Sequence, residues 1–196
     1  MTSIRQITTA AALACTLPLA GTLAAQESDG GTATEGLSMG ETIVDGRTVG
    51  QEYVGDTFGD WAHRCVATAD GNDPCNAYQL LLDSEGNSVA EISLIPLANG
   101  GQAVAGGTIV TPLETLLMQQ ITLQIDAGAA RRYPFSFCTR QGCIARVGFT
   151  QDDIDAMKRG AEATMTIVAA GAPEEPVALN VSLTGFTAAY DALATR

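Results

Sequence analysis

The chain has 196 residues, of which 22 are acidic and 10 are basic, and its formal net charge at neutral pH is -12. A surface this acidic is repelled by phosphate backbones and by anionic lipid faces, so the composition argues against nucleic-acid binding. The chain also contains a single histidine, which gives little support to acid–base catalysis.

The first 25 residues have the pattern of a secretory signal peptide. Arg5 is their only charged residue, and a run rich in Ala, Leu and Thr follows it. Pro18 and Gly21 interrupt this run, which therefore differs from the about 20 strongly apolar residues of a membrane-spanning helix. We expect cleavage after residue 25, export to the periplasm, the medium or the outer surface, and no stable membrane insertion afterwards. A lipoprotein signal that ends at Cys15 is the alternative.

The cysteine count indicates an oxidising compartment. Removal of the signal peptide takes away Cys15 and leaves 5 - 1 = 4 cysteines, an even number in an exported chain. Such a set is typical of two disulfides. Cleavage also removes one base, so the formal charge becomes -12 - 1 = -13.

Residues 26–51 are rich in Gly, Thr, Ser and acidic side chains and poor in large apolar ones. Because this segment cannot bury enough surface to offset the entropy of ordering, we expect a flexible acidic linker. Residues 52–196 are numerous enough to form one domain with its own core. The predicted organisation is a signal peptide, a linker and a single domain.

The stretch from Phe58 to Cys75 contains the only tryptophan and the only histidine. Trp61, His63 and Cys65 alternate along the chain, so in a strand they share one face. We interpret Trp61 as the anchor of a β core and the Cys65–Cys75 pair as a disulfide across the first hairpin. His63 is predicted to be a partly exposed strand residue.

Alternating apolar and polar residues predict strands through most of the domain. The clearest is 177–184, where every second residue is apolar; the others are 61–65, 78–82, 89–95, 103–110, 121–125, 133–137, 144–149 and 163–167. Sequences rich in Gly, Asn and Asp separate several of them and indicate turns. About eight short strands with one-sided hydrophobicity favour a mainly β fold, either an antiparallel β-sandwich or a partly closed barrel.

Two short helices interrupt the strands. The first begins at Thr150–Asp153, which resembles a capping box, and ends at Lys158–Gly160, which supplies cations and a glycine stop. The second is predicted at Thr187–Ala194. The segment Pro112–Gln120 has helically spaced leucines but also fits a loop between strands.

Cys138 and Cys143 lie between two strand-like segments and are separated by four residues. A hairpin loop of this length places them opposite each other, and facing residues of an antiparallel pair have Cα atoms about 4.5 Å apart, which suits a disulfide. Four cysteines allow three connectivities. We predict local pairing, with Cys65 bonded to Cys75 and Cys138 bonded to Cys143.

Other chemistry has little support in the sequence. Neither cysteine spacing is the Cys-x-x-Cys of a redox dithiol, and the paired knuckles of structural zinc sites are absent. A triad of His63, Asp60 and a remote serine such as Ser136 lacks a Gly-x-Ser-x-Gly elbow. The sequence therefore predicts a protein that is not an enzyme, with no metal site and no cofactor.

Four arginines form a charge asymmetry in this acidic chain. Arg131, Arg132, Arg140 and Arg146 lie in a stretch without acidic residues, where aromatic residues alternate beside them. One interpretation is a basic, aromatic-flanked patch that binds an anionic partner. The other is that the arginines pair with carboxylates of the chain itself, or protect an edge strand from aggregation.

Several short motifs together resemble the invasion-associated locus B family. They are Gly59-Asp60-Trp61 with Cys65 and Cys75, Pro112-Leu113, Leu123–Asp126, Phe137-Cys138 with Gly142-Cys143, and Gly185-Phe186 with Tyr190. The resemblance covers about residues 55–194. It implies an exported, β-rich alphaproteobacterial protein from a family named for a role in host-cell invasion, and it carries over the four cysteines and Trp61 as framework positions only.

These observations predict a non-catalytic interaction protein of the cell envelope or the medium, which contributes to host-cell attachment or invasion. Its expected partner is a protein or an anionic surface, and its predicted contact surface is the arginine-bearing hairpin around Cys138 and Cys143. The alternative is a periplasmic protein for envelope maintenance or small-ligand binding, with a cleft between the sheets walled by Trp61 or Tyr78.

Overall fold

The computed structural model describes residues 38–98 and 101–195. The chain divides into two compact units, residues 1–39 and residues 40–196, and the fold given below is that of the second unit. The predicted signal peptide and the first part of the predicted linker lie outside the described residues.

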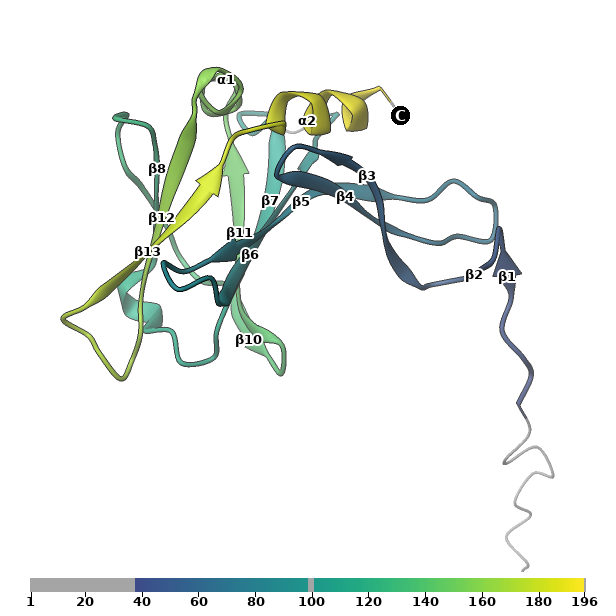
Figure 1. The fold of residues 1–196 in the computed structure, drawn as a ribbon, viewed down its shortest axis with the longest axis horizontal. Coiled ribbons are helices and arrows are strands. Elements are labelled where there is room, and N and C mark those ends of the chain that lie inside the picture. Colours follow the sequence, from purple (N-terminus) through teal and green to yellow (C-terminus); the bar gives the residue numbers. More distant parts are fainter. Residues whose placement is uncertain (1–37, 99–100, 196) are drawn as a thin grey trace, which may run out of the picture. The chain divides into compact units, whose positions relative to one another are not determined.

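The strands form three sheets, and every strand pair is antiparallel (Figure 1). The smallest sheet pairs β1 (Ile43–Val44) with β2 (Arg47–Thr48). The seven-stranded sheet has the order β10 (Phe137–Thr139), β11 (Gly142–Phe149), β7 (Ala105–Thr111), β6 (Ser88–Pro96), β5 (Cys75–Leu82), β4 (Trp61–Val66) and β3 (Glu52–Phe58). The four-stranded sheet has the order β13 (Pro176–Ser182), β12 (Glu162–Val168), β8 (Ile121–Ile125) and β9 (Arg131–Tyr133). The helices are α1 (Gln151–Arg159), α2 (Phe186–Ala194) and a 3-10 turn, η1 (Leu117–Gln119).

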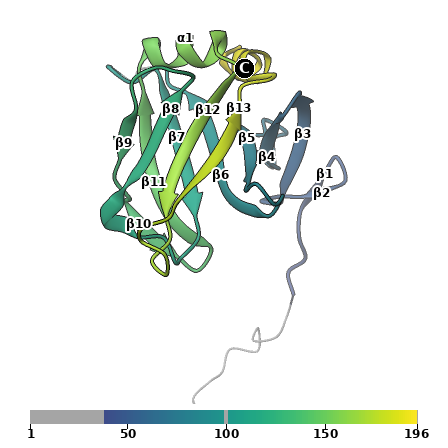
Figure 2. The same cartoon turned by 60° about the vertical axis from the view of Figure 1, so that its left-hand side comes forward.

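The two larger sheets share one hydrophobic core. Figure 2 shows the four-stranded sheet in front of β11, β7 and β6, with both helices at the same end of the strands. Alternate residues of the strands point inward, so that Ile92 and Ile109 of one sheet and Met165 and Leu179 of the other are buried together. The prediction of a mainly β, antiparallel sandwich is confirmed, and the described strands do not close into a barrel.

The described residues contain thirteen strands rather than about eight. The additional ones are mostly very short, and β3 was missed because its sequence, Glu52–Phe58, alternates poorly and carries a bulge between Val54 and Thr57. These strands lack a regular alternation of apolar and polar residues, and the prediction of strands from sequence depends on that alternation.

The two predicted helices are confirmed. Thr150 and Asp153 form a capping box at the start of α1, in which each side chain bonds the backbone of the other residue. α2 begins one residue earlier than predicted, after Gly185, whose φ of +85° suits glycine. A Cβ atom at Gly185 would also collide with the Phe58 carbonyl group, so two constraints select glycine at this position.

Part of the segment predicted to be a linker, residues 43–48, forms a short hairpin. Asp45 and Gly46 both have positive φ, of 49° and 78°, and they connect β1 to β2 as a tight turn. Beyond this hairpin, the Gly50 amide donates to the Ala67 carbonyl oxygen at 2.8 Å. The Asp-Gly turn signal was hidden within an acidic, polar composition that suggested disorder.

The structure also corrects the single strand predicted at 133–137. The chain leaves the four-stranded sheet at Tyr133 and enters the seven-stranded sheet at Phe137. Pro134 lies at this break, where its missing N–H and fixed φ disfavour continued pairing. The ambiguous segment Pro112–Gln120 is a loop with one isolated bridge, between Thr115 and Ala169, followed by η1.

Candidate functional site

The four arginines do not gather into one patch. Arg131 Nη2 lies 3.0 Å from Asp153 Oδ1, in the first turn of the helix that follows β11. Arg140 lies in the turn between β10 and β11, at the opposite end of β11. The two ends are 149 - 142 = 7 residue steps apart, which corresponds to roughly 23 Å in a strand.

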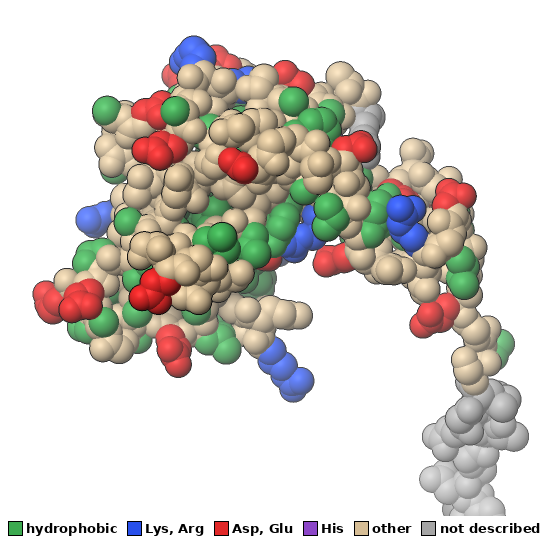
Figure 3. All heavy atoms as spheres, viewed as in Figure 1, with side chains coloured by type: hydrophobic (Ala, Val, Ile, Leu, Met, Phe, Trp, Pro, Cys, Tyr) green, Lys and Arg blue, Asp and Glu red, His purple; other side chains and the backbone are tan. Residues whose placement is uncertain are grey.

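The other two arginines are also separate. The guanidinium carbon of Arg146 lies 5.4 Å from the centre of the Phe137 ring, and Arg132 is exposed on β9. In Figure 3 the visible basic side chains stand apart from one another, while acidic side chains are spread over the surface. The chain changes sheets between the arginines, so Arg131 and Arg140 lie toward opposite ends of β11 and not side by side. The alternative, pairing with the chain's own carboxylates, is found at Arg131.

Trp61 is the core anchor that the sequence predicted. It is 1% exposed, and its ring lies 5.1 Å from the Phe186 ring in an edge-to-face arrangement. Its Nε1–H donates to the Ser182 carbonyl oxygen at 2.7 Å. Trp61 cannot line an accessible cleft because it is fully enclosed. The Tyr78 ring is covered by the Arg64 guanidinium, whose carbon lies 3.5 Å from the ring centre.

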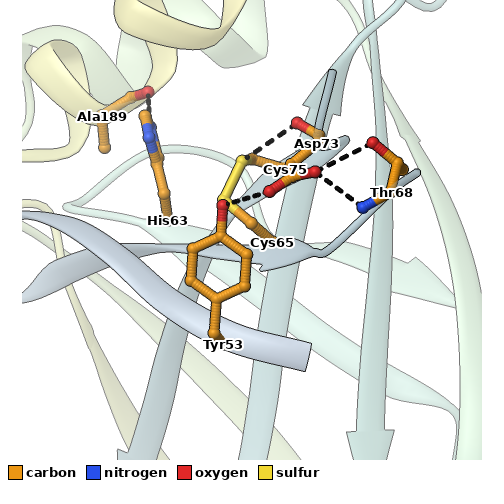
Figure 4. Close-up of a disulfide and its surroundings, with 7 residues drawn as sticks. All are labelled: Tyr53, His63, Cys65, Thr68, Asp73, Cys75 and Ala189. Carbon is orange, nitrogen blue, oxygen red and sulfur yellow. Dashed lines mark hydrogen bonds between the residues drawn. A yellow bond between two sulfur atoms is a disulfide. The ribbon is translucent and has the colours of Figure 1, made fainter. Parts of the chain in front are cut away.

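His63 is buried, which corrects the prediction of a partly exposed residue. Its Nε2–H donates to the Ala189 carbonyl oxygen of α2 at 2.8 Å (Figure 4). The centre of the Phe58 ring lies 4.7 Å from the centre of the imidazole ring. Within the described residues, its Nδ1 has no hydrogen-bond partner. The helix that covers His63 is more than 120 residues further along the chain, so local sequence could not reveal the burial.

Both predicted disulfides are present. Cys65 is bonded to Cys75 and Cys138 to Cys143, and in each pair the Cα atoms are 4.0 Å apart. Each pair consists of directly facing residues, in β4–β5 and in β10–β11. Cys65 and Cys143 are buried, whereas Cys75 is half-buried and Cys138 is exposed.

A carboxylate organises the loop next to the first disulfide. Asp73 accepts hydrogen bonds from the Tyr53 hydroxyl at 2.7 Å and from the Thr68 amide and hydroxyl at 2.7 and 2.9 Å (Figure 4). The Tyr53 hydrogen bond, followed by those of Thr68, lowers the pKa of Asp73 because donors stabilise the charged form. The carboxylate is fully engaged in shaping the loop.

A groove with a volume of about 1200 Å³ lies between this loop and α2. Tyr190 and Leu193 of α2 line one side, and Ile95 and Leu97 at the end of β6 line another. Sequence reasoning missed this groove. The available signal was the unbroken apolar run at residues 94–98, at the end of β6. Because side chains alternate along a strand, Ile95 faces away from the core that buries Leu94, and it is 44% exposed.

The described residues offer no group of three or more His, Cys, Asp or Glu side chains placed to hold a metal ion. None of their helices is both long and apolar enough to span a membrane.

The family model for invasion associated locus B (IalB) protein matches residues 61–194 of the chain. An invasion protein B homolog of Brucella abortus (strain 2308) is 30% identical over 160 residues, which cover 82% of this chain and 88% of the relative. A homolog of the same description from Brucella abortus biovar 1 (strain 9-941) has the same identity and coverage.

Among solved structures, the crystal structure of invasion associated protein B from Bartonella henselae is 25% identical and has a TM-score of 0.61; the match covers 73% of this chain and 95% of that one. The matched region contains both disulfides, Trp61 and nearly all of the two-sheet core. The chain therefore belongs to the invasion associated locus B family.

Proposed function

We propose that this chain is an exported, non-catalytic interaction protein of the cell envelope or the extracellular medium. The observation that carries the proposal is the use of its reactive side chains. All four cysteines of the described domain form disulfides, and its histidine is buried against α2. These are the side chains best suited to nucleophilic or acid–base catalysis, and here they stabilise the fold.

Two further observations support export. Disulfides form and persist in oxidising compartments, and the sequence begins with a pattern typical of secretory signals. The relatives are named for invasion, and on that similarity we extend the proposal to attachment to, or invasion of, a host cell.

The test combines localisation with thiol accessibility. Intact cells are treated with protease, and the cytoplasm, periplasm and medium are assayed for the chain. In parallel, denatured samples are treated with a maleimide reagent that adds mass to each free thiol. We expect a chain shortened by about 25 residues, outside the cytoplasm, with no reactive thiols. A full-length chain in the cytoplasm with all five cysteines as reactive thiols would contradict the proposal.

A periplasmic small-ligand-binding protein is the second candidate, and the groove beside α2 favours it. The groove brings apolar residues such as Leu97 and Leu193 together with polar ones such as Asn72 and Asp73, and small-molecule sites usually combine both kinds. Thermal-shift measurements with pools of apolar metabolites test it, because a ligand that binds only the folded state raises Tm. The shift should disappear in Leu193→Arg, which places a charge in the groove, and should persist in Leu113→Arg, on an exposed loop elsewhere.

A further inference from the structure

The outer edge of β13 is an unusual feature of the four-stranded sheet. β13 is the last strand of that sheet and pairs only with β12 (Figures 1 and 2). Just beyond the strand, the Leu183 amide donates to the Ala161 carbonyl oxygen, on the side of β12. Because backbone groups alternate in direction along a strand, residues 177, 179 and 181 also face β12, and the even-numbered residues face the outer edge.

At one end, side chains close this edge. The Ser182 amide donates to Gln79 Oε1 at 3.0 Å, and Gln79 Nε2 donates to the Ser182 carbonyl oxygen at 3.0 Å. Trp61 Nε1 donates to the same carbonyl oxygen at 2.7 Å. Gln79 is only 5% exposed, so its buried amide takes the place of one residue of a neighbouring strand.

The rest of the edge is open. The N–H and C=O groups of Ala178 and Asn180 point to the same side as those of Ser182, and no partner for them is found in the described part of the chain. Pro176 also faces this side, and it has no N–H to satisfy; proline is accepted within sheets at such edge positions. All three side chains are exposed.

Within the described residues, the other edges of the two larger sheets are protected. β9 and β10 have three residues each, and β9 carries Arg131 and Arg132. β3 is as long as β13, but it contains Glu52 and Asp56 and a bulge. β13 has seven residues, an unbroken register with β12 and no charged residue. Proteins ordinarily blunt such an edge, so its preservation indicates a binding partner.

Charge indicates what kind of partner fits. Residues 160–195, which include β13, contain Glu162, Glu174, Glu175 and Asp191 and no lysine or arginine. Glu174 and Glu175 directly precede the strand. A second copy of the chain would bring an equal net charge of -12, and its own segment 160–195 contains no base to face these carboxylates. An extended segment with basic residues complements both the backbone edge and the acidic flank.

We propose that the edge of β13 from Pro176 to Asn180 binds an extended, cationic peptide segment of a partner protein by strand addition. This inference rests on the proposed interaction function and assigns its contact surface. The backbone of the peptide pairs with Ala178 and Asn180, and its basic residues lie near Glu174 and Glu175. β13 carries no charged side chain that would oppose this approach.

The test is calorimetric titration of the folded, disulfide-bonded domain with the synthetic peptide Lys-Val-Thr-Val-Thr-Val-Lys. A second peptide of the same sequence carries N-methyl groups on alternate amides, and a third has Glu in place of Lys. We expect binding of the first peptide and at least about tenfold weaker binding of the other two, because each lacks edge hydrogen bonds or charge complementarity. Equal binding of the first two peptides would overturn the proposal.

A matched pair of variants locates the site. Asn180→Pro removes one edge-facing N–H, and Asn180→Ala changes the side chain but keeps that N–H. Asn180→Pro should weaken binding by about tenfold or more, whereas Asn180→Ala should bind like the wild type. Unchanged binding by Asn180→Pro would show that the peptide does not bind this edge and would overturn the proposed site. A dimer of the free chain that this variant dissociates would overturn the choice of a cationic partner. Because the peptide series needs no variant, a misfolded Asn180→Pro protein leaves the proposal testable. A chain that is exported and oxidised but binds no peptide refutes this inference alone.

Discussion

Two neighbouring regions of the domain differ in whether their polar groups have hydrogen-bond partners within the domain. Under α2, the side chains of Trp61 and His63 are enclosed, and both donate to backbone carbonyl groups of distant segments. At the outer edge of β13, Ala178 and Asn180 present their backbone groups to solvent. The two regions meet at Ser182, whose amide and carbonyl are the last on that edge to be satisfied from within. In this domain, buried side chains and their hydrogen bonds stabilise the fold, and the unpaired backbone edge of β13 is the proposed binding surface.

The largest expected effect is in the packed region. Trp61→Ala removes a fully buried ring and one donor to Ser182, and it should lower the free energy of unfolding by about 3–5 kcal/mol in urea denaturation. Trp61→Phe keeps an aromatic ring, and we expect roughly half that loss or less. A loss below about 1 kcal/mol for Trp61→Ala would mean that this region is not the anchor of the domain.

The disulfides should have the next largest effect. Replacing Cys65 and Cys75 together by Ala should cost about 2–3 kcal/mol, because the unfolded chain regains the freedom of the closed loop. The same change at Cys138 and Cys143 should cost slightly less, since the sequence separation is 5 rather than 10. Denaturant unfolding of both double variants measures the difference. A larger loss for the second pair would show that the exposed hairpin, not the packed region, limits stability.

Acid should destabilise the loop that Asp73 organises next to the first disulfide. The pKa of Asp73 is lowered in the folded protein, chiefly by the Tyr53 hydroxyl, so the folded state binds its proton less readily than the unfolded state. Its stabilising contribution is therefore present above the ordinary aspartate pKa of about 4 and is lost as pH falls through the lowered value. Asp73→Asn should be less stable than the wild type at pH 7, and the gap should narrow below about pH 4 in urea titrations. A constant gap would contradict this role.

The smallest effect on stability is expected at the open edge. Asn180→Pro should change the free energy of unfolding by less than about 1 kcal/mol, because the lost N–H has no partner in the folded domain and the side chain is exposed. Leu179→Pro is the control one residue away, whose N–H faces β12, and it should cost about 3 kcal/mol or more. Similar losses for the two variants would show that both amides are paired.

Local sequence predicted the features that depend on near neighbours. The capping box of α1, both disulfides and the shared face of Trp61 and Cys65 involve residues within a few positions or across one hairpin. Distant contacts were not predictable in this way. The burial of His63 depends on Ala189, and the closure of the β13 edge depends on Gln79, which is 103 residues from Ser182.

The arginines illustrate the same limit. Arg131 and Arg140 are close in sequence, and closeness suggested one surface. At Pro134 the chain passes from the four-stranded sheet to the seven-stranded sheet. Arg131 therefore pairs with Asp153, whereas Arg140 lies in the turn between β10 and β11. Composition and spacing describe a segment, but the path of the chain decides which side chains share a surface.

The most direct test of the open edge is amide hydrogen exchange of the free, oxidised domain, followed residue by residue by NMR. We predict rapid exchange at Ala178 and Asn180, and slow exchange at Leu179 and Val181, which bond to β12, and at Ser182, which bonds to Gln79. This alternation along a single strand would demonstrate an unpaired edge next to a closed one. Slow exchange at Ala178 and Asn180, equal to that of their neighbours, would show that the edge is already covered and would contradict the account.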